Sequence, residues 1–217
     1  MTIVTKKPPI KETVGAQYIC FDVPDTDGAW TPTFEPTVEK TEVVKSVNVT
    51  ENAEQTDVYA SGKIYDTVKG TVTSDIAVSV IAFEEATLAK MRGDKVDNGG
   101  LILRGGNGER AFFAYGKVVK LKGGKVRMDW YPKCKLTENS DQIESKEDSY
   151  SEKTDDLTIH ALPFDDDGNN VVSVHSDVNF PEWLTEDLFF SKVIMTKEDL
   201  ASLQPTTTNQ NSLDDGE

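Results

Sequence analysis

The chain has few of the features that mark membrane, secreted or disulfide-rich proteins. No apolar run approaches the roughly 20 residues that span a bilayer, and the amino-terminal stretch MTIVTKKPPIKE has no apolar signal-peptide core. The two cysteines, Cys20 and Cys134, lie far apart at strand-like positions, so we expect buried thiols rather than a disulfide or a metal pair. We therefore expect a protein without membrane spans that is made in a cytoplasm.

Basic residues are scarce relative to acidic ones. The chain has 23 Lys and Arg against 38 Asp and Glu, which gives a formal net charge of −15. A protein that binds nucleic acid without sequence preference has to neutralise phosphates, so this balance argues against that class. A surface that repels DNA is compatible with it.

Motifs for catalysis, cofactors and metals are missing as well. The run GGNG at 105–108 lacks the G-x-G-x-x-G spacing and the helix that would follow it in a phosphate-binding loop. The run DDDGN at 165–169 lacks the closing acid of a calcium loop, and His160 and His175 have no third ligand that would make a zinc site. No serine lies in a nucleophile elbow and no cysteine lies near a histidine in sequence. We predict no enzyme activity, no cofactor and no metal.

The length and the pattern of the chain predict one mainly β domain. With 217 residues and 37% hydrophobic residues, it can bury a real core. We predict a β-sandwich or barrel-like domain over 14–203 with one flanking helix and a short C-terminal helix. Residues 1–13, with Pro8-Pro9, are expected to form an extended arm, and the polar tail 204–217 is expected to be disordered.

The stretch from Ala111 to Leu136 predicts a central antiparallel hairpin. Two alternating runs flank Lys122-Gly123-Gly124-Lys125, where the glycines supply the positive φ of a tight two-residue turn. We expect a half-buried hairpin, with one face packed against a strand pair and a helix. The expected core face is Val126, Met128, Trp130, Cys134 and Leu136; the expected outer face is Arg127, Asp129, Tyr131, Lys133 and Lys135; the expected partners are Val43, Val47, Val72, Ile76, Phe83 and Leu88.

Residues 39–52 and 71–80 alternate as two long strands, each with one polar face of small residues. Residues 53–70 between them show no clear period and carry four large apolar or aromatic side chains. We expect an irregular contact loop there, because aromatic side chains favour a partner over disorder.

The remaining elements follow from local signals. The spacing over 83–91 predicts a helix that ends at Gly93, and the acidic stretch 137–156 predicts a mobile loop or a solvated strand extension. Further strands are expected over 14–23, 101–103, 157–164 and 171–178, with a hairpin turn at 165–170 and a short helix that begins at 180–184.

The order and texture of these elements resemble a known family. The segments are TEVVKSVNVTENAEQTDVYASG, KGTVTSDIAVSV, FEEATLAKMRG, DNGGLILRGGNGERAFFAYGKVV and GGKVRMDWYPKCKL, followed by an acid-rich connection, over about residues 40–178. In this order they are similar to the major tail tube proteins of long-tailed, siphovirus-type phages of Gram-positive bacteria.

The resemblance implies a structural virion protein whose hexameric rings stack into a tail tube, with a strand pair from each subunit lining a channel for DNA ejection. The implied partners are other copies of the chain and the tape measure, tail tip and terminator proteins, while DNA passes without specific binding. A negative lumen would keep a polyanion from sticking. The residues expected to face the lumen are Glu42, Ser46, Asn48, Thr71, Thr73 and Asp75, and those expected to join one ring to the next are Asp57, Val58, Tyr59, Lys63, Ile64 and Tyr65.

Two other classes stay open at this stage. A β-sandwich module of a virion that binds a carbohydrate or a receptor would account for the strands, but it leaves the polar strand faces and the 53–70 segment without a use. An enzyme would need an active site that the sequence does not reveal.

Overall fold

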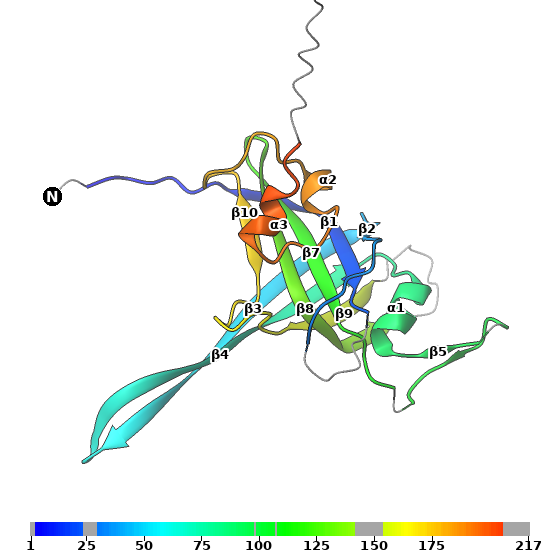
Figure 1. The fold of residues 1–217 in the computed structure, drawn as a ribbon, viewed down its shortest axis with the longest axis horizontal. Helices are drawn as coiled ribbons and strands as arrows, with labels where there is room; N and C mark the ends of the chain where they lie inside the picture. Colours follow the sequence, from blue (N-terminus) through cyan, green and yellow to red (C-terminus); the bar gives the residue numbers. More distant parts are fainter. Residues whose placement is uncertain (1–2, 24–29, 98, 107, 142–153, 206–217) are drawn as a thin grey trace, which may run out of the picture.

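The computed structural model describes residues 3–23, 30–97, 99–106, 108–141 and 154–205, and its fold is mainly β, as predicted (Figure 1). The strands are β1 (Lys11–Phe21), β2 (Glu39–Thr41), β3 (Val44–Ala60), β4 (Lys63–Val80), β5 (Lys95–Val96), β6 (Ile102–Leu103), β7 (Phe113–Leu121), β8 (Lys125–Asp141), β9 (Asp155–Ala161) and β10 (Val172–His175). The helices are α1 (Glu85–Arg92), α2 (Glu186–Phe189) and α3 (Lys197–Ala201).

Eight of the strands form one antiparallel sheet that curls on itself. Its order is β2-β1-β7-β8-β9-β4-β3, with β10 also paired to β8, while β5 and β6 form a separate two-stranded ribbon. Side chains of β1 and β7 share a core with those of β4 and β9, so the two halves of the sheet face each other. The result is a barrel-like sheet that stays open between the edges of β1 and β3, where a cleft of about 640 Å³ lies.

The predicted central hairpin is confirmed as β7 and β8. Leu121 pairs with Lys125, so the loop has three residues rather than two, and Gly123 and Gly124 adopt φ values of 85° and 74°. Glycine suits both positions because a side chain at positive φ is strained. The predicted need for two glycines in the turn is confirmed, but the loop is one residue longer than predicted.

Strand β8 changes partners at its middle. Residues 127–130 pair with β10, whereas residues 134–141 pair with β9. Pro132 lies between these two stretches, and the register with β7 shifts there, between the pairs Tyr115–Tyr131 and Phe113–Cys134. A proline has no N–H to donate, so a bulge is where a long strand tolerates it.

This bulge corrects the predicted faces of the hairpin. Met128 and Trp130 lie on one face of the sheet, but Cys134 and Leu136 lie on the other, because the extra residue inverts the alternation. Leu136 joins Ile76 in the first core, as predicted. Trp130 does not, and packs against the C-terminal segment instead.

Two cores lie on opposite faces of the sheet. The first core, inside the curl, includes Ile19, Phe21, Ile76, Phe113, Tyr115, Tyr131, Leu136, Leu157 and Ile159, with Leu88 and Met91 from α1. The second core lies under the C-terminal segment and includes Tyr18, Met128, Trp130, Leu184, Phe189, Phe190 and Ile194. The ring of Phe190 stacks on Tyr18 at 3.8 Å between centroids and meets Trp130 edge-on at 5.1 Å. The hairpin is therefore covered on both faces, and the prediction of one solvent face was wrong.

The helices differ in how well the sequence predicted them. Helix α1 ends at Gly93, which is left-handed with φ of 72°, as the glycine stop predicted. The second helix begins later than predicted, at Glu186, because Thr185 is its N-cap and accepts from the Leu188 N–H. In the part of the chain that the structure describes, no helix is long and apolar enough to cross a membrane.

Strands β9 and β10 were predicted as neighbours joined by a hairpin turn, but they do not pair with each other. Both pair with β8, at different parts of its length. The connection is a compact turn in which the Asp165 carboxylate accepts from the Asn169 backbone N–H at 2.8 Å and Gly168 has a positive φ of 82°. The acidic stretch 137–156 begins as the end of β8, and its part from 142 to 153 lies outside the described residues, as does most of the predicted tail.

Candidate functional site

The segment 53–70, predicted as an irregular loop, is the outer part of a long β-hairpin. Strands β3 and β4 stay paired from Val44–Val80 to Ala60–Lys63, with register shifts after Val44, Ala53 and Val58, and the hairpin projects from the body as a two-stranded ribbon (Figure 1). We call residues 53–70 the ribbon. The turn is Ser61-Gly62, with φ values of 53° and 75°, which is the geometry that favours a two-residue hairpin turn.

Large apolar side chains on the ribbon are exposed to solvent. The exposed fractions are 43% for Val58, 67% for Tyr59, 57% for Ile64, 79% for Tyr65 and 54% for Val68. Val58 and Tyr59 are adjacent on β3, which has no extra residue at the register shift between them, and adjacent residues of a strand point to opposite faces. Both faces of the ribbon are therefore partly apolar, so no single core of this chain can cover them.

A ribbon of this kind is not expected to be stable in water on its own. Isolated two-stranded hairpins are marginal, because they bury too little apolar surface to offset the entropy of ordering. Ribbon side chains bond chiefly to one another: the Thr67 hydroxyl donates to the Asp57 carboxylate across the strands at 2.8 Å. The exposed apolar side chains of the ribbon therefore indicate that a partner covers it.

The part of β3 and β4 next to the body has one polar outer face, as predicted. The pairs Asn48–Ala77, Thr50–Asp75 and Asn52–Thr73 alternate with Val47–Val78 and Val49–Ile76, whose side chains pack in or against the first core. Ser46 and Thr71 are exposed, and Thr73 and Asp75 are partly exposed. Glu42 differs from this set, because it precedes β3 and makes an ion pair with Lys40 at 3.1 Å.

Asp75 organises the polar face. Its carboxylate lies 2.6 Å from His160 Nδ1 on β9 and accepts from Asn52 Nδ2 on β3 at 2.7 Å. The hydrogen bond with His160 holds the pKa of the Asp75 carboxyl below its usual range. The face therefore keeps a carboxylate in a fixed position across three neighbouring strands.

The cleft between β1 and β3 has a floor of buried charges. Lys117 and Asp129, 3% and 2% exposed, form an ion pair, and the Ser173 hydroxyl also donates to Asp129. Arg127 Nε lies 3.1 Å from Asp129 Oδ2, and Tyr131 lies among the lining residues. Burial lowers the pKa of Lys117, and the charge of Asp129 opposes that shift.

Sequence reasoning missed this charge cluster. Asp129 and Arg127 were placed on a solvent face because they alternate with Met128 and Trp130, and a period-two pattern cannot tell water from a second buried layer. The pairing of Lys117 with Asp129 across β7 and β8 was readable from the hairpin register once the Gly-Gly turn was placed.

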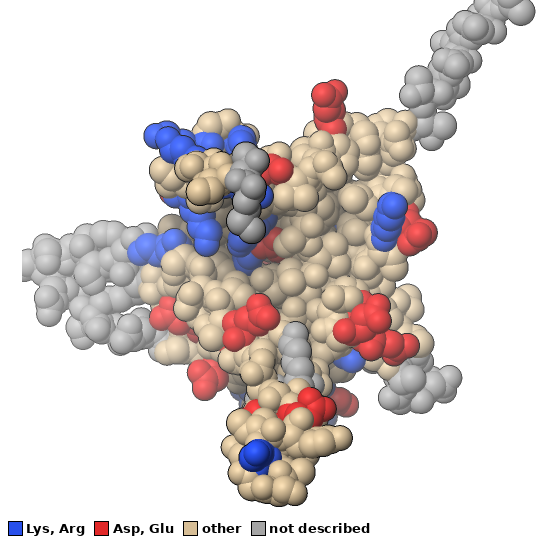
Figure 2. Space-filling view, turned by 90° about the vertical axis from the view of Figure 1, so that its left-hand side faces the viewer, with Lys and Arg blue, Asp and Glu red and all other residues tan. Residues whose placement is uncertain are grey.

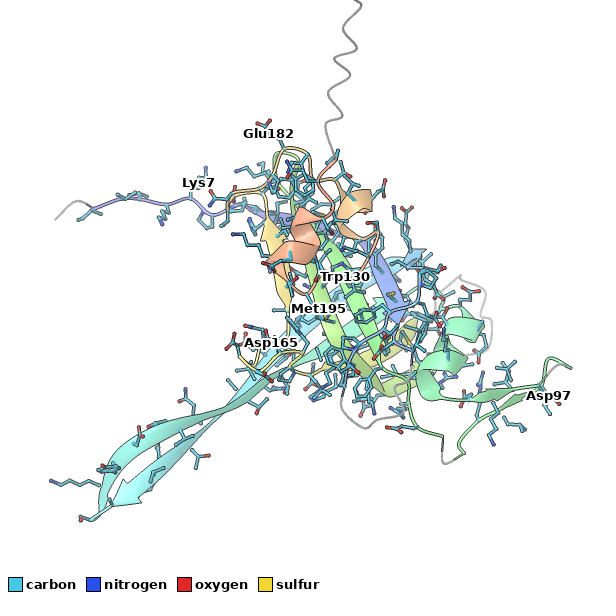
Figure 3. All side chains as sticks on the ribbon, in the orientation of Figure 1. Lys7, Asp97, Trp130, Asp165, Glu182 and Met195 are labelled. Atoms are coloured by element: carbon cyan, nitrogen blue, oxygen red, sulfur yellow. The ribbon has the colours of Figure 1, made fainter. Side chains whose placement is uncertain are left out.

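The arm and the β5–β6 ribbon also carry exposed side chains. The arm, residues 3–10, is extended and exposed before β1, and Figure 3 places Lys7 on it. At another part of the molecule β5 and β6 form a short ribbon whose Val96 and Leu103 are 62% and 55% exposed.

Sites for chemistry do not emerge from the described residues. Within 3–23, 30–97, 99–106, 108–141 and 154–205, no group of three or more His, Cys, Asp or Glu side chains is arranged to hold a metal ion. His160 pairs with Asp75, whereas His175 accepts from the Asp177 backbone N–H. The two histidines therefore have different hydrogen-bond partners. No protein-family model matches this chain, and no curated protein matches it either.

Proposed function

We propose that this chain is a structural virion protein of the tail tube type, which assembles as hexameric rings stacked into a conduit for DNA ejection. The observation that carries the proposal is the ribbon, an ordered two-stranded extension with exposed apolar side chains on both faces. An extension of this kind is a contact element for another copy, because no part of the body among the described residues covers it.

The polar face of β3, β4 and β9 supports the same proposal. A tube lumen must let DNA slide, so it needs small polar side chains and fixed negative charge rather than cations that bind phosphate. Asn48, Thr73 and Asp75 meet that demand, and His160 holds the Asp75 carboxylate in place. In this proposal the polar face lines the channel and the ribbon joins one ring to the next.

The proposed partners follow from the assembly. They are other copies of this chain along the tube, and the tape measure, tail tip and terminator proteins inside it and at its ends. DNA passes through the lumen without specific binding, and the virion tail is the location of the assembled protein.

The cleft between β1 and β3 is the observation that would favour a binding module instead. Most of its buried charges are paired, since Lys117 and Ser173 bond to Asp129, while Arg127 Nε lies 3.1 Å from the same carboxylate without a hydrogen bond. A carbohydrate site presents several polar groups free to bond a ligand, so the paired charges of the cleft floor favour a structural role.

Negative-stain electron microscopy of the purified protein after concentration tests the proposal. Rings or stacked tubes of uniform width are the expected result. Particles that stay compact monomers under all concentrations and salt conditions, together with glycan binding, would replace the tube with the binding module.

A further inference from the structure

A cluster of lysines stands out on this acidic chain. It lies where the arm meets the turn between β7 and β8, and the Lys122 backbone N–H donates to the Ile10 carbonyl there at 2.8 Å. A groove of about 510 Å³ runs between residues 6–10 and the turn. We call this cluster the basic patch, and its members are Lys6, Lys7, Lys11, Lys120, Lys122 and Lys125.

The basic patch is unusual given the composition. The whole chain has 23 basic side chains and a formal net charge of −15. Of the patch, Lys125 has an ion pair with Asp177, and Asp177 is the one acidic residue among the described residues that line the groove. Figure 2 shows Lys and Arg side chains gathered in the upper part of the face from which the arm and the ribbon extend, with Asp and Glu side chains prominent below. Excess positive charge is thus concentrated in one place.

The arm adds apolar surface beside these lysines. The exposed fractions are 93% for Ile3, 71% for Val4 and 60% for Ile10. Pro8 and Pro9 line the groove and keep this segment extended rather than helical. A partner for this region therefore needs acidic groups next to large apolar side chains.

The ribbon has this chemistry. Asp57 and Asp66 are exposed beside the exposed side chains of Tyr59, Ile64 and Tyr65, and one cation, Lys63, is exposed next to the turn. Aromatic side chains cover an apolar partner at low entropic cost, while the charges fix orientation. Figure 1 shows the arm and the ribbon leaving the body in different directions, so one copy does not join its own two surfaces.

We propose that the basic patch and arm of one copy receive the ribbon of a second copy of this chain. The inference rests on the proposed function and adds which surface accepts the ribbon. Because the two surfaces differ, the contact is heterologous, and repeating it builds rings or stacks rather than a closed two-fold dimer. Asp57 and Asp66 approach Lys6 and Lys7, while Tyr59 and Tyr65 cover the apolar side chains of the arm.

Charge exchange between full-length variants tests this contact. One variant carries Lys6→Glu and Lys7→Glu, and the other carries Asp57→Lys and Asp66→Lys. In the first variant two of the six patch lysines become glutamates that repel Asp57 and Asp66, and in the second the ribbon carries lysines that face the patch lysines. The concentration at which assemblies appear should therefore rise about tenfold or more in either variant alone. Mixed in equal amounts, each variant offers the surface that its counterpart needs, and assembly should return.

A matched control separates this effect from a change in net charge. The double variant Lys95→Glu and Lys197→Glu changes the net charge by the same amount as Lys6→Glu and Lys7→Glu, at exposed sites outside the patch. It should assemble like the parent. Circular dichroism and the thermal midpoint should be unchanged in all three variants, because the substituted side chains are exposed.

Sedimentation velocity measures the size of the species in solution, and negative-stain images show whether those species are tubes. Mixtures that regain large species support the contact even if the species are not tubes, in which case the tail tube function is wrong. Tubes from either double variant alone at the parent's concentration overturn the contact and leave the tube function standing. A parent that remains monomeric overturns both.

Discussion

Removal of the ribbon tip should separate folding from assembly. Thr56 pairs with Val68, and Asp57 with Thr67, so residues 57–67 can be replaced by Asn-Gly, which closes a two-residue turn between Thr56 and Val68. Among the described residues, neither core includes a member of the deleted segment. The shortened subunit should therefore fold, with a thermal midpoint within about 4 °C of the parent's, since 1 kcal/mol shifts a protein of this size by about 2–4 °C.

The loss in assembly should be much larger than the change in stability. Tyr59, Ile64 and Tyr65 are 67%, 57% and 79% exposed in the single chain. At about 25 cal/mol per Å², covering these three side chains contributes roughly 6–9 kcal/mol to a contact before the costs of association. Each 1.4 kcal/mol is about a factor of ten in affinity, so losing most of this contribution abolishes stacking at ordinary protein concentrations.

Circular dichroism and negative-stain images of parent and shortened protein at equal concentration provide the measurement. A useful control keeps the ribbon and substitutes Val96→Ser and Leu103→Ser, which removes exposed apolar groups from the β5–β6 ribbon. The control should assemble if the ribbon is the specific contact. Tubes of normal length from the shortened protein would refute the reasoning and shift the contact to another surface.

Four further outcomes follow from individual side chains. Trp130→Ala should lower the free energy of unfolding by about 3–5 kcal/mol, measured by denaturant titration, since the indole is fully buried; an unchanged midpoint would contradict the second core. Asp129→Asn should cost about 3–5 kcal/mol, because it leaves the buried Lys117 ammonium unpaired, and adding Lys117→Met should recover part of that loss. Burial raises the pKa of Cys20 to about 11, so a thiol reagent at pH 8 should label native protein far more slowly than unfolded protein, with fast native labelling as the contrary result. Asp75→Lys should leave the fold intact but slow DNA ejection from particles through attraction to phosphate; ejection at the normal rate would remove Asp75 from the lumen.

The sequence predicted the fold class and the central hairpin because these depend on local signals. Alternation, a Gly-Gly turn and the Gly93 stop each act over a few residues, and all three are seen in the structure. The ribbon was missed for a local reason as well. Its turn, Ser61-Gly62, is a known turn dipeptide, but the adjacent apolar pairs Val58-Tyr59 and Ile64-Tyr65 hide the period of two.

The second core was not predictable from alternation. Tyr131 belongs to the first core and Asp129 lies on the same face of the sheet in the floor of the cleft, while Met128 and Trp130 belong to the second core. Whether a face is covered depends on a segment more than fifty residues later in the chain. Phe189 and Phe190 supply that cover. The bulge at Pro132 adds a shift of register that a strict period of two cannot represent. Whether a later segment covers a strand face, and where a bulge occurs, depend on tertiary contacts. Local sequence patterns therefore do not predict them.

The ribbon and the arm point to the same physical requirement. A long exposed strand pair with apolar side chains is a hazard for a monomer, because its edges invite unspecific pairing. In the proposed contact, the exposed carboxylates of Asp57 and Asp66 repel those of other ribbons, whereas the basic patch attracts them. Charge would then act as the selector and the tyrosines as the main source of affinity. A closed or stacked heterologous assembly covers every ribbon except those at the ends, which turns a hazard of the single chain into the contact that the assembled structure requires.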